Sequence, residues 1–347
     1  MIKRMKKLSL AIFFLAVSTS MSGCGKDSDK VEATPIPTVT STIENGQIPM
    51  DAVVLTVGDT SITYGDALLY ILQVVNQYEP SFGEGLWGFQ VDENSTFEDM
   101  AKDEIINQLS QLSIIASEAE KLEISLSGDE KDEINDSVRD YLSKITEKDQ
   151  KKYNITEDMV YQVLADNYLA EKVFAIVTNK VNTDISDDEA KQMVVQQLVV
   201  LTNGTDKLGT KVSKSEEEKK AAKTKASNLL KEAKKAKDFA SFASSNSDLD
   251  QVEYTLGKGD NKEIEDVAFA LEDGQISKVI ETSYGYVILR CVDHFDEEAT
   301  AAKKEEIIET EQNNIFQEQF LSWSKHYSIT VNSKVWDKIS MADYENE

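Results

Sequence analysis

The run MVVQQLVVL at residues 193–201 marks the point where the character of this 347-residue chain changes. The run is short, rich in β-branched residues, and followed by Asn203-Gly204, a pair that is typical of turns. It therefore predicts a strand. On both sides of it, apolar residues recur at the three-to-four-residue spacing of helices. The folded part of the chain is thus expected to be helical, then mixed, then helical again.

Helix starts are predicted where a hydroxyl residue is followed three positions later by an acid, which is the pattern of a capping box. The pairs are Thr63 with Asp66, Ser95 with Glu98, Ser127 with Glu130, and Ser186 with Glu189. Further helices are predicted over about 157–181, 216–237 and 297–327, and a loop with Gly and Pro over 80–94. We interpret the apolar stripes of these helices as core.

Short strands are predicted at both ends of the folded part. Residues 52–57 (AVVLTV) and 328–331 (SITV) are rich in β-branched residues, and we expect them to pair and close the helical domain. Other strands are predicted at 279–280 and 286–292. The predicted fold class is therefore α+β: a mostly helical domain formed from both ends of the chain, with a compact α+β domain inserted between them.

The amino terminus has the pattern of a secretory signal. Four bases and no acid occur in the first seven residues, an apolar run covers 8–17, and Met21-Ser22-Gly23 lead to Cys24. The run is shorter than the ~20 residues that span a bilayer. The stretch before Cys24 resembles the bacterial lipobox, which implies that this cysteine carries a lipid on the outer face of a bacterial cell membrane. The alternative is an ordinary cleaved signal with a chance cysteine.

The body of the chain is strongly acidic. Its formal net charge is −26, and about −30 once residues 1–23 are removed. Such a surface repels nucleic acid and anionic lipid, so the lipid on Cys24 would have to provide the membrane attachment. Residues 24–50 are polar and rich in Thr and Pro, and we interpret them as a disordered tether.

The predicted inserted domain contains five characteristic stretches: DFASFA (238–243), SD (247–248), TLGKG (255–259), AFALEDGQIS (268–277) and TSYGY (282–286). In order and spacing they resemble parvulins, the PpiC or rotamase type of peptidyl-prolyl isomerase. The segment at 57–63 and the helices after it resemble the amino-terminal chaperone domain of SurA and PrsA proteins. The whole mature chain is similar to a PrsA-like foldase lipoprotein, which implies unfolded or newly exported polypeptides as partners.

The combined interpretation divides the chain into a lipoprotein signal, a tether, and a two-part chaperone domain interrupted by a parvulin-like domain. The expected limits are 1–23 for the signal, 24–50 for the tether, 51–186 and 298–347 for the chaperone domain, and 187–297 for the parvulin-like domain.

The resemblance fails at the positions that imply chemistry. Parvulins have histidines in the first and last strands, where this chain has Val199 and Val287, and Leu249 stands where an aspartate or cysteine is usual, with Asp250 next to it. The implied proline pocket is Leu256, Ile264 and Phe269, Ile264 replacing a phenylalanine. The resemblance implies that the family's residues at the positions of Val199, Leu249 and Val287 form a network of polar groups beside the proline pocket. If every polar member of that network is replaced by an apolar residue, no polar group is left without a hydrogen-bond partner. We therefore expect a stable domain with weak or lost isomerase activity. Alternatively, Val199 and Val287 are simply strand core, and Leu256, Ile264 and Phe269 are core as well.

Other chemistry finds little support in the sequence. His294 and His326 lack the spacing of metal ligands, and Cys291 fits a small buried residue, so no metal or cofactor is expected. Trp87, Phe89 and Trp323 are candidate contacts for unfolded chains, or core residues. The function expected is an extracytoplasmic folding factor. The alternatives are an active isomerase with an altered pocket, and an adaptor lipoprotein that binds one partner.

Overall fold

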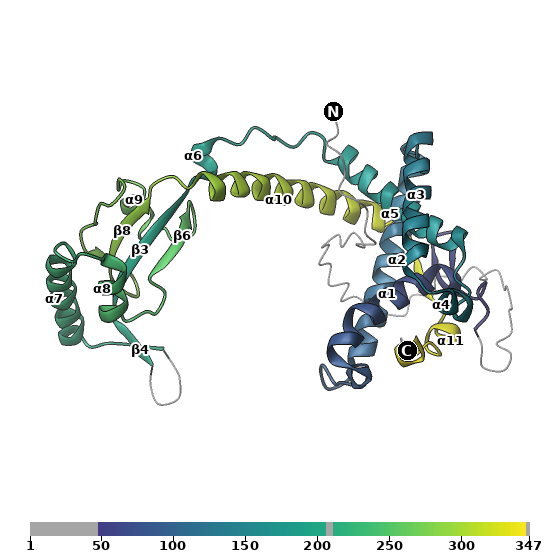
Figure 1. The fold of residues 1–347 in the computed structure, drawn as a ribbon, viewed down its shortest axis with the longest axis horizontal. Coiled ribbons are helices and arrows are strands. Elements are labelled where there is room, and N and C mark those ends of the chain that lie inside the picture. Colours follow the sequence, from purple (N-terminus) through teal and green to yellow (C-terminus); the bar gives the residue numbers. More distant parts are fainter. Residues whose placement is uncertain (1–47, 206–210, 345–347) are drawn as a thin grey trace. The chain divides into compact units, whose positions relative to one another are not determined.

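The structure is a computed structural model that describes residues 48–205 and 211–344 (Figure 1). Cys24, the signal-like segment and nearly all of the predicted tether lie outside these residues. The described chain forms two compact units: unit 1 contains residues 48–180 and 313–344, and unit 2 contains residues 181–312. The predicted inserted domain, 187–297, has somewhat narrower limits than unit 2.

Unit 1 is mostly helical. Its elements before the chain enters unit 2 are β1 (Val53–Val57), β2 (Thr60–Thr63), α1 (Tyr64–Phe82), η1 (Glu84–Leu86), α2 (Phe97–Lys121), α3 (Gly128–Lys144), α4 (Glu147–Lys152) and α5 (Glu157–Val177). After unit 2 the chain adds the end of α10 (Glu297–Ser324), β9 (Ile329–Val331), α11 (Ser333–Trp336) and η2 (Met341–Tyr344). No helix of the described residues combines the length and apolar character that crossing a membrane takes.

The two ends of the chain meet in one small sheet, in the order β2-β1-β9. Strands β1 and β9 pair antiparallel, with Leu55 opposite Val331. The Asn332 side chain donates to the Val53 carbonyl at 2.8 Å, and the hydroxyls of Tyr64 and Tyr344 lie 2.7 Å apart. The predicted pairing of the two terminal strands is therefore confirmed.

The predicted helix starts are mostly confirmed. Full capping boxes open α1 at Thr63 and α3 at Ser127. The prediction for α2 was wrong by one residue, because the box is formed by Thr96 and Asp99, while the carbonyl of Ser95 accepts from Val91 in the preceding turn. The predicted loop at 80–94 also starts too early: α1 continues through Pro80 to Phe82, although this proline has no N–H for the i→i−4 bond and the helix ends two residues after it.

One hydrophobic core holds unit 1 together. It includes fully buried residues of β1, α1, α2 and α5, and also Phe316, Phe320 and Trp323 of α10. The ring of Phe316 lies 5.2 Å from that of Phe174 and 6.0 Å from that of Trp323. Burying such a side chain contributes about 1.5–3 kcal/mol, so the carboxy-terminal segment is an integral part of this core.

Unit 2 is built around an antiparallel four-stranded sheet in the order β6-β3-β8-β7. Its elements are α6 (Asp187–Ala190), β3 (Gln192–Leu201), β4 (Asn203–Thr205), β5 (Lys211–Ser213), α7 (Glu216–Ala233), α8 (Phe239–Asn246), β6 (Glu253–Gly257), α9 (Glu265–Ala268), β7 (Ile280–Glu281), β8 (Gly285–Asp293) and the start of α10. The fold class is α+β, as predicted. The predicted helix at 216–237 ends earlier, at Ala233, because the chain turns there toward Asp238, which caps α8.

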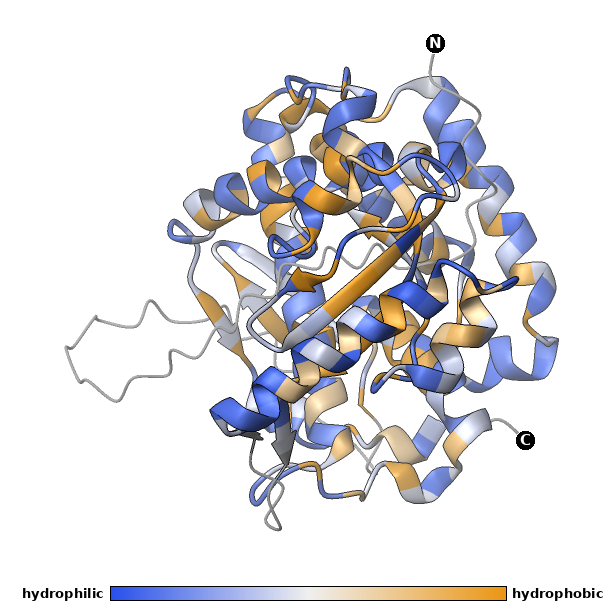
Figure 2. Cartoon of the chain, turned by 90° about the vertical axis from the view of Figure 1, so that its left-hand side faces the viewer, coloured by the Kyte–Doolittle hydropathy of each residue, from blue (hydrophilic) through white to orange (hydrophobic). Residues whose placement is uncertain are grey.

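Strand alternation gives the central sheet two buried faces. Leu198, Val200 and Ile288 pack under α7 and α8, whereas Val199, Val287 and Leu289 pack on the opposite face with α9. Figure 2 shows hydrophobic residues concentrated on the strands and hydrophilic residues on the outward sides of the helices. The second face, covered by α9, is the one on which the predicted site residues meet.

Candidate functional site

Val199 and Val287 form a directly opposed pair at the centre of unit 2. They are Cα partners in the ladder between β3 and β8, and their side chains point to the same face. Both are 0% exposed. Neither side chain can donate or accept a hydrogen bond, and neither reaches solvent, so the pair is a hydrophobic contact.

The three predicted pocket residues belong to the same cluster. Leu256 on β6 and Ile264 before α9 are buried against the valine pair, and Phe269 lies at the edge, partly exposed. The Lys191 ammonium lies 5.6 Å from the centre of the Phe269 ring. The structure thus brings together five of the six parvulin-type residues named from the sequence, as a packed layer whose only partly exposed member is Phe269.

Leu249 does not join them. It is 37% exposed and belongs to neither core cluster of unit 2. The preceding residues have a structural role instead: Ser247 accepts from the Val199 amide, and Asp248 both donates its amide to the Val199 carbonyl and accepts from the Leu201 amide. These bonds provide hydrogen-bond partners for the backbone groups of β3 that lie beyond the end of its neighbour β6. Asp250, the alternative position, is also exposed.

Two tyrosines at the rim of this cluster were not singled out in the sequence. Tyr254 and Tyr284 are both partly buried against it. Burial, with the nearby Tyr284 and the charge of Asp260, raises the pKa of Tyr254 to about 12, so its hydroxyl keeps its proton at neutral pH. The Asn261 amide donates to the Tyr284 hydroxyl at 3.3 Å.

The loops above the cluster are joined by further bonds. Ser283 donates both its amide and its hydroxyl to the Glu263 carboxylate, at 3.0–3.1 Å. Together with the bond between Asn261 and Tyr284, these contacts hold the segment before α9 against the turn before β8. The sequence contained no signal for this contact, because the partners are about 20 residues apart and their types are common in loops.

Gln197 is a polar residue that the sequence analysis also missed. It lies two residues before Val199 on β3, is buried, and donates its side-chain amide to the Gln251 carbonyl at 2.8 Å. Because that bond ties Gln197 to the chain before β6, we assign it to fold stability.

Cys291 is buried on the same face, and burial with the neighbouring Asp273 charge raises the pKa of its thiol to about 11. The thiol is therefore protonated at neutral pH and a poor nucleophile.

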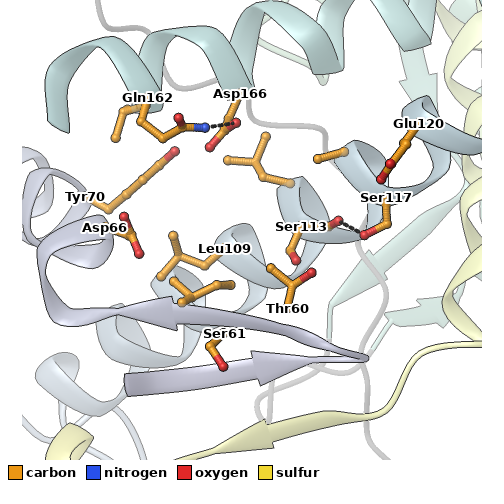
Figure 3. A pocket seen from close by; sticks show the side chains of 14 residues that line it. Thr60, Ser61, Asp66, Tyr70, Leu109, Ser113, Ser117, Glu120, Gln162 and Asp166 are labelled. Atoms are coloured by element: carbon orange, nitrogen blue, oxygen red, sulfur yellow. Dashed lines mark hydrogen bonds between the residues drawn. The ribbon is translucent and has the colours of Figure 1, made fainter. Parts of the chain in front are cut away.

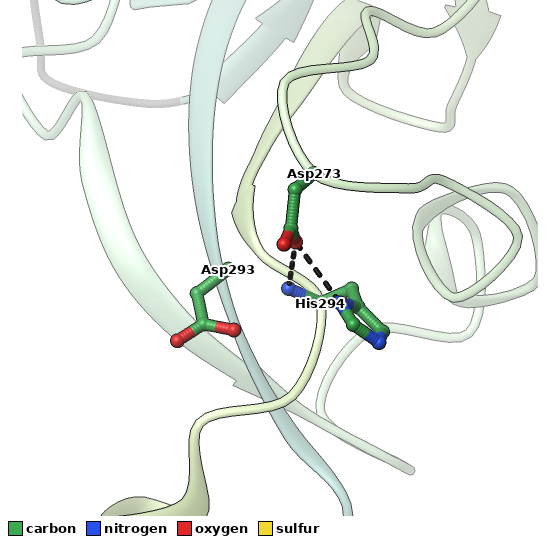
Figure 4. A group of neighbouring side chains, drawn as sticks. All are labelled: Asp273, Asp293 and His294. Carbon is green, nitrogen blue, oxygen red and sulfur yellow. Dashed lines mark hydrogen bonds and ion pairs between the residues drawn. The ribbon is translucent and has the colours of Figure 1, made fainter.

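Asp273, Asp293 and His294 form a surface group that sequence spacing did not indicate (Figure 4). One atom from each lies within 4.8 Å of the others, and all three residues are exposed. Asp273 accepts from the His294 amide at 2.7 Å and contacts its ring Nδ1 at 3.0 Å, and these bonds hold the pKa of Asp273 below its usual value. The bonds account for the grouping without an ion.

The three candidate aromatic contacts in unit 1 differ in exposure. Trp87 and Trp323 are buried in the core, so they cannot contact an unfolded chain, whereas Phe89 is 62% exposed. Phe82, Val91 and Met100 are also exposed large apolar residues, so four of them lie within 82–100. We call this set the apolar tip; Phe82 ends α1, Phe89 and Val91 lie on the segment between α1 and α2, and Met100 lies in the first turn of α2.

Unit 2 is thus an α+β domain whose four-stranded antiparallel sheet has a hydrophobic cluster on each face. Residues 205–293 match the Rotamase family, described as the PPIC-type PPIASE domain. The chain as a whole is similar to the foldase protein PrsA of Clostridium tetani (strain Massachusetts / E88), with 23% identity over 96% of this chain and 97% of that protein. The foldase protein PrsA of Caldanaerobacter subterraneus subsp. tengcongensis is 24% identical, with 82% of each chain covered.

Solved structures give similar matches. The PrsA peptidylprolyl isomerase from Bacillus cereus matches at 18% identity and a TM-score of 0.35, covering 75% of this chain and 99% of that one. A structure of the SurA-like chaperones PEB4 and Cj1289 of Campylobacter jejuni matches at 13% identity and a TM-score of 0.29, covering 80% and 98%. The predicted resemblance to PrsA-like foldases with a PpiC-type domain is confirmed by the matches to the family and to the curated relatives.

Proposed function

We propose that this protein is an extracytoplasmic folding factor that binds unfolded exported polypeptides, and that its PPIC-type domain isomerises prolyl bonds slowly or not at all. The similarity to PrsA foldases over nearly the whole chain supports the first part. The observation that carries the second part is the Val199–Val287 pair, fully buried and apolar at the centre of the domain.

The chemistry of the reaction explains why this pair matters. Rotation about a prolyl bond meets a barrier of ~18–20 kcal/mol, which arises from lost amide resonance. An enzyme lowers it by interactions that are stronger in the twisted state than in the planar one. Here Val199 and Val287 offer no hydrogen bond, and Leu256 and Ile264 are enclosed as well. The face therefore presents a packed layer to a proline, and its partly exposed residues lie at the rim: Leu201, Tyr254, Phe269, Leu271 and Tyr284.

A protease-coupled assay with a proline-containing peptide tests the weak or lost activity. We expect the full chain to leave the observed rate close to the uncatalysed one, and an active parvulin assayed in parallel serves as the positive control. A turnover close to that control would contradict the proposal and favour an isomerase with an altered pocket.

The apolar tip is our candidate surface for unfolded chains. Exposed large apolar side chains gathered on one segment are the kind of surface that binds exposed apolar segments of other proteins. Phe89→Ser should reduce suppression of aggregation of a chemically reduced model protein, because it removes the aromatic contact. Ile176→Ser, which alters an exposed apolar residue of α5, is the matched control. Equal suppression by both variants would exclude the apolar tip, and no suppression by the unaltered protein would favour an adaptor lipoprotein.

We further propose that Cys24 carries a lipid that anchors the protein to the outer face of a bacterial cell membrane. The support is the sequence pattern of residues 1–24 alone. Labelling with a radioactive fatty acid, followed by cell fractionation, tests it. The label should appear in the unaltered protein and be lost in Cys24→Ala, which should also leave the membrane fraction. Label that persists in the variant would disprove the assignment.

A further inference from the structure

A cleft runs across unit 1 between β2, α1, α2 and α5 (Figure 3). Its first hollow has a volume of about 500 Å³, within the range typical of ligand sites. It continues into a second hollow of about 560 Å³ near α3, and both are lined by Ala116, Glu120, Gln162 and Asp166. All the elements involved belong to unit 1, so the cleft is part of a single packed body.

The charge of this cleft is one-sided. Asp66, Glu120 and Asp166 line the first hollow, which no lysine, arginine or histidine of the described residues lines. The second hollow adds Glu123 and one base, Lys131. The lining as a whole therefore carries four acids and one base. We call it the acidic cleft.

Asp166 is a half-buried acid that lines both hollows. Its carboxylate accepts from the Gln162 side chain at 2.7 Å (Figure 3), and no ion pair found among the described residues includes it. Burial, with the nearby charge of Asp66, raises its pKa to about 6. Asp166 is half-buried, and the charged form of a partly desolvated carboxylate is disfavoured unless a cation lies close to it. Strained or costly groups of this kind are concentrated at functional sites.

A hydroxyl in the same wall also lacks a partner. Ser113 lines the first hollow, and its Oγ atom is buried with no hydrogen bond. Its neighbours on α2 behave differently: Ser110 donates to the Ile106 carbonyl at 2.7 Å, and Ser117 to that of Ser113 at 2.9 Å. A buried polar atom that makes no hydrogen bond costs about 1–3 kcal/mol. We therefore expect a polar group to bind near Ser113.

The apolar part of the first hollow is formed by Ile62, Leu109, Leu112, Ala116 and Val163, and it lies beside the uncharged polar residues Thr60, Ser61 and Ser117. A small hydrated cation would gain nothing from such a surface. A lysine or arginine side chain combines a charged end group with an aliphatic stem that packs well on apolar surface.

We propose that the acidic cleft binds a lysine or arginine side chain of an extended client polypeptide. The charged end of that side chain would lie at Asp166, and its aliphatic stem would lie on the apolar residues of the first hollow. The proposal rests on the proposed function as a folding factor, and it names a chemical preference for that function. Acidic side chains would be repelled by the carboxylates of the cleft. Aromatic side chains would supply no positive charge to Asp166.

Fluorescence anisotropy with the full chain tests the proposal. The probe is a labelled ten-residue peptide of Gly, Ser, Ala and Leu with one central lysine, and its control peptide has norleucine there, which keeps the stem and removes the charge. We expect the lysine peptide to bind at least about tenfold more tightly, since a partly desolvated ion pair is worth this much or more. Substituting arginine for the lysine should retain the preference.

Two variants locate the site. Asp166→Asn should weaken binding of the lysine peptide about tenfold and leave the norleucine peptide unchanged. Ala116→Phe keeps every charge but fills the cleft, and should weaken both peptides. Asp132→Asn, which removes an exposed acid of α3 outside the cleft, is the matched control and should change neither. Circular dichroism verifies that each variant is folded.

Equal binding of the lysine and norleucine peptides to the unaltered protein would overturn the proposal, as would an unchanged preference in a folded Asp166→Asn variant. Tight binding of spermidine, with no advantage for the lysine peptide, would overturn it in favour of a small amine. Aggregation assays separate these failures from failure of the proposed function. If only the cleft assignment fails, the unaltered protein still suppresses aggregation; if the folding function fails, it does not.

Discussion

Asp166→Asn should make unit 1 more stable at neutral and alkaline pH. The variant keeps a side-chain oxygen that can accept from Gln162 and removes a charge that burial disfavours. The pKa of Asp166 is raised to about 6, whereas an aspartate in an unfolded chain has a pKa near 3.9. The difference of about two pH units, at ~1.4 kcal/mol each, corresponds to about 3 kcal/mol.

The sign follows from proton linkage. Between pH ~3.9 and ~6 the unfolded chain loses this proton while the folded chain keeps it, so ionisation favours unfolding as the pH rises. The penalty is complete above about pH 7 and absent below the unfolded pKa. Asparagine does not titrate. The stabilisation by Asp166→Asn should therefore be about 3 kcal/mol at pH 8 and less than ~1 kcal/mol at pH 4.

Urea unfolding followed by tryptophan fluorescence measures this difference. All three tryptophans, Trp87, Trp323 and Trp336, are buried in unit 1, so the signal reports this unit specifically. With a slope of ~2–3 kcal/mol per molar urea, the midpoint should rise by about 1 M at pH 8. Asp132→Asn should shift it little at either pH. A gain of equal size at both pH values, or a loss at pH 8, would refute the reasoning.

The other predictions concern the two cores. Val287→Asn should destabilise unit 2 by more than ~2 kcal/mol, because it buries an amide without partners, and should leave the tryptophan signal of unit 1 unchanged; a stable unit 2 by circular dichroism would contradict this. Phe316→Ala should cost unit 1 about 3–5 kcal/mol in urea unfolding, whereas Leu321→Ala, at a 37% exposed position of the same helix, should cost under ~1 kcal/mol. Gly285→Ala should destabilise unit 2, because a Cβ there would lie 2.4 Å from the Val200 carbonyl oxygen; thermal unfolding like that of the unaltered protein would show that the strand can shift.

Much of the fold could be predicted because it depends on local patterns. Thr63 and Ser127 were recognisable as helix caps, since a capping box involves residues only three apart. The boundary errors have the same origin: the signals at Ser95 and Thr96 are equivalent in sequence, and the turn bonded to Ser95 decides between them. Pairing of the terminal strands was predictable as well, because each is too short to be stable alone.

The functional surfaces were less accessible from sequence. Trp87, Phe89 and Trp323 are similar as sequence features, yet two are core and one is exposed, because exposure depends on which helices cover them. The parvulin-type positions were located by resemblance, and the structure adds that Val199 and Val287 are enclosed while Leu249 lies apart. The spacing of residues along the sequence does not indicate whether Leu249 belongs to that cluster.

The sequence by itself determined where the long helices and the strands β1, β3, β8 and β9 lie, that the two ends of the chain belong to one domain, and which residue types stand at the parvulin-type positions. These properties follow from periodicity, capping and motif order, which are local patterns in the sequence. The tertiary structure alone decided that Asp66, Glu120 and Asp166 line one hollow, which no basic residue of the described chain lines. In the sequence they resemble the chain's other acids, because burial and distance between helices arise only when α1, α2 and α5 pack.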